Sequence, residues 1–271
     1  MTGTIPSPFR PKSSPYRVLL FDCVNTLYLP DASGLPRVRV GGKEIPSTAP
    51  LLLERLRPHF PNLAEETVHH AARAAWRWAE GERGQALAEV PAPRRFRRFL
   101  HELGSHVGSL EWKDNGTPAG LPEGLAEELL EVHMEQVTAS FTFPEDHRRL
   151  LETLRGHFRL ALFSNFDHGP SLRALLEHTG IAPWFDPLII SDGLGFRKPG
   201  REAFQRALAL VKAPPESVLF IGDSVEDDVE GGRKAGLDVA WINRRNEPTP
   251  RDPAPTYVLP DLPALAGLLG E

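Results

Sequence analysis

Short apolar runs recur along the chain, and each one ends in a polar or acidic residue. They have the length and near-continuous hydrophobicity of strands that are covered on both faces of a sheet. The clearest are RVLLFD (17–22), FRLALFSN (158–165), SVLFIGD (217–223) and DVAWIN (238–243), and PLIISD (187–192) is a weaker fifth. Helical patterns lie between them, in EDHRRLLETLRGH, SLRALLEHTG, GREAFQRALALV and DVEGGRKAG. Strands that alternate with helices predict an α/β fold, a doubly wound parallel sheet with right-handed crossovers.

Side chains with catalytic potential stand where these predicted strands end. They are Asp22, Ser164, Asp192 and Asp223. In an open parallel sheet, ligands bind in the crevice beyond the carboxyl ends of the strands. The sequence therefore predicts a functional site at that edge of the sheet.

The segment between the first two core strands has a different character. PRVRVGGKEIP predicts a hairpin that turns at Gly41-Gly42. Helical patterns follow near 48–57, 63–80, 93–107 and 122–138. We interpret residues 31–141 as a helical cap inserted into an α/β core made of 16–30 and 142–271. Residues 1–15 are polar and predict a flexible arm.

Composition limits the class of protein and its partners. Of the 271 residues, 41% are hydrophobic and 25% are charged, which is typical of a globular chain with a substantial core. No apolar run approaches the roughly 18 residues that suggest a membrane span, so we expect no membrane partner. The first residues lack the apolar segment of a secretory signal. A single cysteine, Cys23, excludes internal disulfides and favours a cytoplasmic location.

The charge pattern gives no indication of nucleic-acid binding. The formal net charge is −5, which does not favour a polyanionic partner. The basic run PRRFRRFLHELG (93–104) is best interpreted as an amphipathic helix. Its Phe96, Phe99 and Leu100 are expected to face inward and its arginines to face water.

Four ordered features together resemble the motifs of the haloacid-dehalogenase-like superfamily across residues 16–265. They are DCVNT, which begins at Asp22; Ser164-Asn165; Lys198 in GFRKPGREAF; and GDSVEDDVEGGRKAG, which contains Asp223. The position of the cap matches the subgroup whose helical cap is inserted just after the first motif. Each feature alone is weak, but the combination and its order are specific.

The resemblance implies a role for each of these residues. Asp22 is expected to attack phosphorus and form an aspartyl-phosphate, while Ser164 and Lys198 bind the phosphoryl group and balance its charge. Mg²⁺, which prefers oxygen ligands, is expected to bind Asp22, Asp223, Asp228 and the backbone carbonyl of Val24. Asp227 is the alternative to Asp228 in this acidic cluster. Asn165 and Thr26 are expected to bind substrate.

The sequence departs from the phosphatases of this family at Val24. They carry there an aspartate that protonates the leaving group and later activates water, a contribution of roughly 10²–10⁴ in rate. Neither valine nor the neighbouring Asn25 can transfer a proton in this way. Asp167 and His168, just past the second strand, are the nearest substitutes, although both also fit the start of the next helix.

Three interpretations of this substitution remain open. The first is a phosphatase with atypical acid/base catalysis that acts on a small phosphorylated metabolite. The second is a haloacid dehalogenase, which also lacks the second aspartate but works without metal. The strongly acidic GDSVEDD motif argues against it, because clustered carboxylates without a cation repel one another. The third is a binding or regulatory protein with the same fold, an interpretation that does not explain why Asp22 is present. Neither the substrate nor the oligomeric state can be predicted.

Overall fold

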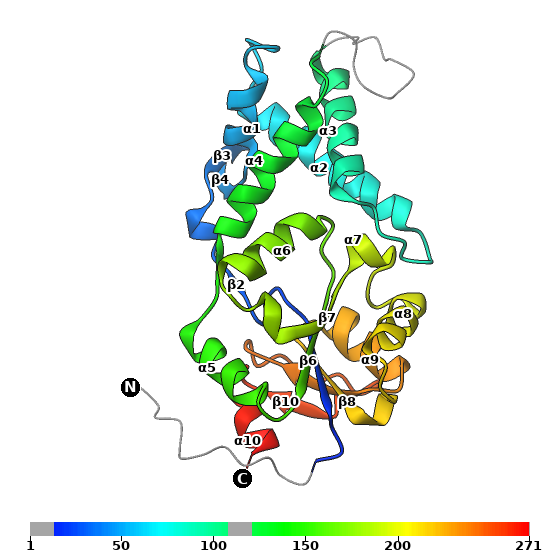
Figure 1. Cartoon of the computed structure of the whole chain (residues 1–271). Helices are drawn as coiled ribbons and strands as arrows, with labels where there is room; N and C mark the ends of the chain where they lie inside the picture. Colours follow the sequence, from blue (N-terminus) through cyan, green and yellow to red (C-terminus); the bar gives the residue numbers. More distant parts are fainter. Residues whose placement is uncertain (1–13, 108–120, 271) are drawn as a thin grey trace. The chain divides into compact units, whose positions relative to one another are not determined.

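The structure, a computed structural model that describes residues 14–107 and 121–270, contains a parallel six-stranded sheet. The strand order is β10-β9-β8-β1-β6-β7, and every neighbouring pair is parallel. This arrangement confirms the predicted α/β fold (Figure 1). The strands are β1 (Val18–Phe21), β6 (Arg159–Ser164), β7 (Phe185–Ile190), β8 (Val218–Gly222), β9 (Asp238–Ile242) and β10 (Tyr257–Leu259).

Helices lie between most of these strands along the chain, and one helix follows the last strand. All four residues of β1 are buried, and because successive side chains point to opposite faces, both faces of the sheet are covered. The helices are α5 (Glu145–Leu154), α6 (Gly169–His178), α7 (Ser191–Leu194), α8 (Arg201–Val211), α9 (Gly231–Lys234) and α10 (Leu265–Leu269). Short single turns are η1 (Ala32–Gly34), η2 (Ala182–Trp184), η3 (Pro215–Ser217) and the π-helical η4 (Val225–Glu230).

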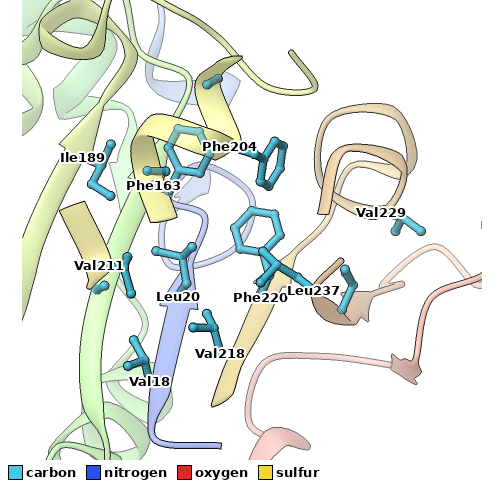
Figure 2. Packing of buried hydrophobic residues seen from close by; sticks show 14 of the residues in the cluster. Val18, Leu20, Phe163, Ile189, Phe204, Val211, Val218, Phe220, Val229 and Leu237 are labelled. Atoms are coloured by element: carbon cyan, nitrogen blue, oxygen red, sulfur yellow. The ribbon is translucent and has the colours of Figure 1, made fainter. Parts of the chain in front are cut away.

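One face of the sheet packs against α8 in a core rich in aromatic rings (Figure 2). Phe204 of α8 meets Phe163 and Phe220 of the sheet edge-to-face, with centroids 5.3 and 5.5 Å apart, a geometry that aromatic pairs prefer. Gly231 of α9 also lies close to this cluster, because a Cβ there would approach the Phe204 ring to 2.4 Å. The core therefore fixes the strands whose ends carry the predicted motifs.

The chain divides into two compact units. Among the described residues, the core unit contains those up to Leu29, Phe143–Asn165 and those from Leu176 onward. The second unit contains Pro30–Thr142 and also Phe166–Leu175, a segment that the sequence-based division placed with the α/β core. The backbone N–H of Ala92 donates to the carbonyl of Asp167 at 2.7 Å. This hydrogen bond ties the segment Phe166–Leu175 to the rest of the second unit.

In its described residues, the second unit contains the predicted hairpin, four whole helices and the first part of α6. β3 (Arg37–Val40) and β4 (Lys43–Pro46) pair antiparallel, and Gly41 and Gly42 both have positive φ, as the tight turn between them requires. The helices are α1 (Ala49–Leu56), α2 (Glu65–Arg83), α3 (Ala92–Val107) and α4 (Leu125–Ala139). Phe96, Phe99 and Leu100 of α3 are buried, as the amphipathic pattern predicted.

Several short elements were not predicted. β2 (Leu29–Pro30), β5 (Phe141–Thr142), β10 and α10 have at most five residues each, too few to produce a clear hydrophobic period. The apolar run at 187–192 also ends earlier than predicted, because β7 stops at Ile190 and Asp192 belongs to α7. None of the described helices combines the length and the apolar character that crossing a membrane requires.

Candidate active site

A cavity of about 630 Å³ lies in the core unit, at the edge of the sheet where β1, β6 and β8 end. It is the place that the open parallel sheet leaves for a ligand. Among the residues that line it are Asp22, Ser164, Asn165, Lys198, Asp223 and Asp228. These residues come from four separate segments of the sequence, and the fold brings them together. Asp192 is not part of the cavity lining.

Lys198 joins two of the carboxylates. Its Nζ donates to Asp22 Oδ1 at 2.7 Å and to Asp228 Oδ1 at 2.6 Å. All three residues are buried, with exposed fractions of 3% for Lys198, 7% for Asp22 and 1% for Asp228. One carboxylate oxygen from each of Asp22, Asp223 and Asp228 lies within 4.8 Å of the other two. The two hydrogen bonds of Lys198 are charge-assisted and short, and bonds of this kind are among the strongest in proteins.

The electrostatics of this acidic cluster favour an additional cation. Burial raises the pKa of Asp22 to about 6, with Lys198 opposing the shift and Asp228 adding to it. Burial and the negative charges of Asp22 and Asp228 raise the pKa of Asp223 to about 7. Burial disfavours the charged form of Lys198, but the two carboxylates outweigh this effect, so its pKa lies above the ordinary value. One ammonium group thus faces three carboxylates, an imbalance that a divalent cation would correct.

Asn165 holds the backbone of Lys198. Its Oδ1 accepts from the Lys198 N–H at 2.8 Å, and its Nδ2 donates to the Lys198 carbonyl at 2.9 Å. The same Nδ2 donates to Asp227 Oδ2 at 3.1 Å. These contacts use both ends of the amide and support the backbone of Lys198. Asn165 also lines the cavity, so the substrate contact predicted from the sequence stays a prediction.

The two adjacent aspartates of the fourth motif face different partners. Asp228 contacts Lys198, and its Oδ2 accepts from the backbone N–H of Ser224 at 3.0 Å. Asp227 instead lies beside Asn165, and burial raises its pKa. Asp228, and not Asp227, therefore lies beside Asp22 and Asp223, which is the arrangement preferred from the sequence.

Gly222, at the end of β8, makes room for Asp228. A Cβ at residue 222 would lie 2.3 Å from Asp228 Oδ2 and 2.4 Å from its Cγ. We expect Gly222→Ala to displace the Asp228 carboxylate and to weaken metal binding at least about tenfold, since outer-shell changes commonly cost 10–100-fold in metal affinity. Isothermal titration with Mg²⁺ measures this effect. Gly193→Ala is the matched control, because a Cβ there meets no atom within 4 Å. Equal affinities in the two variants would contradict the expectation.

The first motif places Val24 and Thr26 differently. Val24 lines the cavity. Its hydrocarbon side chain cannot transfer a proton to a ligand there. Thr26 is fully buried, does not line the cavity, and donates to Asp223 Oδ1 at 3.5 Å. From this position Thr26 can support the acidic cluster through Asp223. The position is less suitable for the substrate contact that we predicted. Cys23 is also buried and away from the cavity lining, as expected for a neighbour of Asp22 in an extended segment.

The two predicted substitutes for the missing acid lie in the second unit, outside this cavity lining. The Asp167 carboxylate accepts from Arg95 Nε at 2.8 Å in a buried ion pair. His168 Nδ1 lies 2.7 Å from the hydroxyl of Ser171, in the first turn of α6. These contacts favour structural roles for both residues.

The end of β9 and the loop after it also line the cavity, and neither was predicted from the sequence to do so. Trp241 Nε1 donates to the backbone carbonyl of Asp223 at 2.8 Å. Arg244 lines the cavity and donates to the carbonyls of Asn25 and Thr26. Trp241 and Arg244 lie at and just after the end of the predicted strand DVAWIN. Because that strand ends at the same edge of the sheet as the recognised motifs, its end could have been predicted to line the site.

Comparison with known proteins shows the class to which the chain belongs. The model of the family described as haloacid dehalogenase-like hydrolase matches residues 16–236. The chain is therefore a member of the haloacid dehalogenase-like hydrolases, and the resemblance noted in the sequence is confirmed. The six-stranded parallel sheet agrees with this assignment.

Particular relatives include phosphatases. The chain is 31% identical to the phosphoserine phosphatase of Thermus thermophilus over 214 residues, 78% of each chain. It is 37% identical to the pyrimidine 5'-nucleotidase YjjG of Escherichia coli over 122 residues, 44% of this chain and about half (53%) of that protein. In fold it is similar to a 2-haloacid dehalogenase from Pseudomonas syringae, with a TM-score of 0.68 at 20% identity, over 93% of this chain and 97% of the other.

Proposed function

We propose that this hydrolase is a Mg²⁺-dependent phosphatase of small phosphorylated metabolites that forms an aspartyl-phosphate on Asp22. The observation that carries the proposal is the position of Asp22, hydrogen-bonded to Lys198 within the cluster of three carboxylates. A phosphoryl-transfer site needs a nucleophile, a cation and donors for the phosphoryl oxygens. The relatives that are phosphatases support the same reaction class. A cytoplasmic location and a capping role for residues 31–141 belong to this proposal.

Each residue has a role in the proposed reaction. A carboxylate oxygen of Asp22 attacks phosphorus while the bond to the leaving oxygen breaks, and water later cleaves the acyl phosphate. Lys198 neutralises charge on Asp22 and on the phosphoryl group. Ser164, which lines the cavity, donates its hydroxyl hydrogen to a phosphoryl oxygen in this proposal. Asn165 keeps Lys198 in position.

The acidic cluster fits a magnesium ion. Asp22, Asp223 and Asp228 together with the Val24 carbonyl are the residues that would hold it, and their oxygen atoms are the ligands that this hard cation prefers. When bound, the ion stabilises the negative charge of the transferring phosphoryl group. A sequence relative, YfnB of Bacillus subtilis, is 28% identical over 194 residues, and a solved structure of that protein is bound to magnesium.

A panel of phosphorylated metabolites, assayed for phosphate release with Mg²⁺ and with EDTA, tests the function. Halide release from short 2-haloacids is measured in parallel. We expect Mg²⁺-dependent phosphate release and no halide release. Halide release that persists in EDTA, without phosphate release, would establish the dehalogenase alternative. Absence of both activities, in protein that binds Mg²⁺, would favour a binding protein.

Magnesium is also expected to stabilise the fold. A ligand that binds only the native state adds RT ln(1 + [L]/Kd), which is about 2.7 kcal/mol at a hundredfold excess over Kd. We therefore expect Mg²⁺ at millimolar concentration to raise the Tm, and Asp228→Asn to reduce the shift. Differential scanning fluorimetry at constant ionic strength measures it, with Na⁺ at equal ionic strength as the control. An unchanged Tm in wild-type protein would speak against a metal site.

The absence of an acid at Val24 predicts a strong dependence on the leaving group. We expect kcat/KM for 4-nitrophenyl phosphate or an acyl phosphate to exceed that for a sugar phosphate, because nitrophenolate and carboxylate depart without a proton. Val24→Asp is expected to narrow this difference by raising the rate of the sugar phosphate. The ceiling is the roughly 10²–10⁴ that a positioned acid contributes. A smaller gain is expected, because a new carboxylate lacks the contacts that hold its rotamer.

Val24→Asn is the matched control for Val24→Asp, since its side chain has the same shape and no titratable proton. Both variants are compared with wild type for the two kinds of substrate, with the Tm measured for each. Equal rates for good and poor leaving groups in wild type would mean that another residue supplies the proton. Asp167 and His168 are then the next positions to mutate.

A further inference from the structure

Arg244 connects the loop after β9 to the loop after β1. Its Nη1 donates to the carbonyl of Asn25, and its Nη2 donates to the carbonyl of Thr26 at 3.2 Å. One planar guanidinium thus contacts two consecutive carbonyls, a use for which its rigid geometry is suited. The contact joins residues more than 200 positions apart in the sequence.

The loop that Arg244 contacts is a tight turn over Asn25–Tyr28, which begins directly after Val24. The N–H of Asn25 donates to the carbonyl of Tyr28 at 2.7 Å, and the N–H groups of Leu27 and Tyr28 donate to the carbonyl of Cys23 at 2.8 and 2.9 Å. Asn25 has a φ of 63°, a left-handed conformation that asparagine tolerates better than most residues. The side-chain donors of Arg244 satisfy the two carbonyls that the turn directs toward it.

Arg244 itself is presented by an ordered loop. The side chain of Asn243 donates from Nδ2 to the carbonyl of Glu247 at 2.9 Å and accepts from the Glu247 N–H at 2.8 Å. The backbone N–H of Asn243 also donates to Leu259 of β10 at 2.8 Å. The neighbouring Arg245 makes a different contact, an ion pair of 3.8 Å with Glu247, and its side chain is 87% exposed.

We propose that Arg244 is a positioning residue, which holds the Asn25–Tyr28 turn and thereby orients Asp22 and the Val24 carbonyl for the reaction. The catalytic part of this inference rests on the proposed function. Asp22 and Val24 immediately precede the turn, so movement of the turn changes the direction of both groups. A misplacement of about 1 Å can cost on the order of 10²-fold in rate, which is enough to make a residue outside the chemistry important.

The kinetic test compares Arg244→Met, Arg244→Lys and Arg245→Met with wild type, using 4-nitrophenyl phosphate and Mg²⁺. We expect Arg244→Met to lower kcat by roughly 10–10²-fold with little change in KM, the pattern of a lost contribution to the transition state. Arg244→Lys is expected to recover little, because a single ammonium cannot reproduce the two-nitrogen contact. Arg245→Met removes the same charge from the adjacent residue, so a loss of kcat confined to Arg244 excludes a general charge effect.

The structural test does not depend on turnover. Hydrogen exchange followed by mass spectrometry is measured on peptides that cover residues 22–29. We expect faster exchange in Arg244→Met than in wild type and in Arg245→Met. Unchanged exchange, or a rise in KM alone, would overturn the positioning role. If wild type has no phosphatase activity while exchange is still faster in Arg244→Met, the proposed function fails and the control of the turn by Arg244 stands.

Discussion

Asp22→Asn is expected to abolish turnover while leaving the fold intact. The amide has nearly the same shape as the carboxylate, and its oxygen can still accept from Lys198, but it cannot attack phosphorus. The substitution also removes the Asp22 carboxylate, whose pKa burial has raised, from the cluster that it forms with Asp223 and Asp228. We therefore expect metal-free Asp22→Asn to be at least as stable as wild type at pH 8, where the buried charge is most costly.

Steady-state phosphate release and urea denaturation in EDTA measure these two effects. Acid-quenched wild type, sampled during turnover, is expected to carry one phosphoryl group on the peptide that contains Asp22. Asp192→Asn is the matched control, because Asp192 also follows a strand but lies in α7, away from the cavity lining. Turnover by Asp22→Asn at the wild-type rate, with deamidation excluded by mass spectrometry, would remove Asp22 from the mechanism.

The central part of the fold could be predicted because its signals are local. Each inner strand is a continuous apolar run, and the pattern identified β1, β6 and β8 without any knowledge of their neighbours. The rule that ligands bind at the carboxyl ends of parallel strands then brought Asp22, Ser164 and Asp223 to one edge. Lys198 has no such local signal and was identified only from its family motif.

The supporting contacts could not be predicted because they join residues that are distant in the sequence. Asn165 carries the same amide whether it binds a substrate or, as here, the backbone of a residue 33 positions away. Arg244 lies 219 positions from the carbonyl that it contacts. Hydrophobic period and motif spacing describe neighbours along the chain, so they contain no information on such pairs. The structure thus adds the contacts of Asn165 with Lys198 and those of Arg244 with the loop after β1.

The charge balance of the acidic cluster predicts how the metal-free protein responds to pH. The pKa of Asp22 is raised from 3.8 to about 6, and that of Asp223 from 3.8 to about 7. Between pH 4 and these values the folded protein retains protons that the unfolded chain releases. The two carboxyls therefore stabilise the metal-free fold at low pH relative to neutral pH, and this contribution is lost as pH rises through that window.

Lys198→Met is expected to make the metal-free fold lose more stability as pH rises. It is also expected to cause the largest loss of stability among the substitutions considered. Methionine has a similar length but no charge, so the carboxylates of Asp22 and Asp228 lose their shared donor. Removing one partner of a buried ion pair typically costs about 3–5 kcal/mol. In the absence of metal, we expect this loss of stability at pH 8. We expect a smaller loss at pH 5, where the Asp22 and Asp223 carboxyls can take up protons. The loss of kcat is expected to be at least about 10²-fold, as for the removal of one donor to a developing oxyanion.

Urea denaturation of Lys198→Met at pH 5 and pH 8 in EDTA, each compared with wild type, measures this pH dependence. Lys234→Met is the matched control, because Lys234 makes an exposed ion pair with Glu230 at 2.8 Å. Such i,i+4 pairs contribute only about 0.3–0.5 kcal/mol. Mg²⁺ is expected to restore part of the stability of Lys198→Met at pH 8, because a divalent cation compensates the same carboxylates, but it should not restore kcat. Equal destabilisation at both pH values would mean that Lys198 acts through packing, and not through the charge of the acidic cluster.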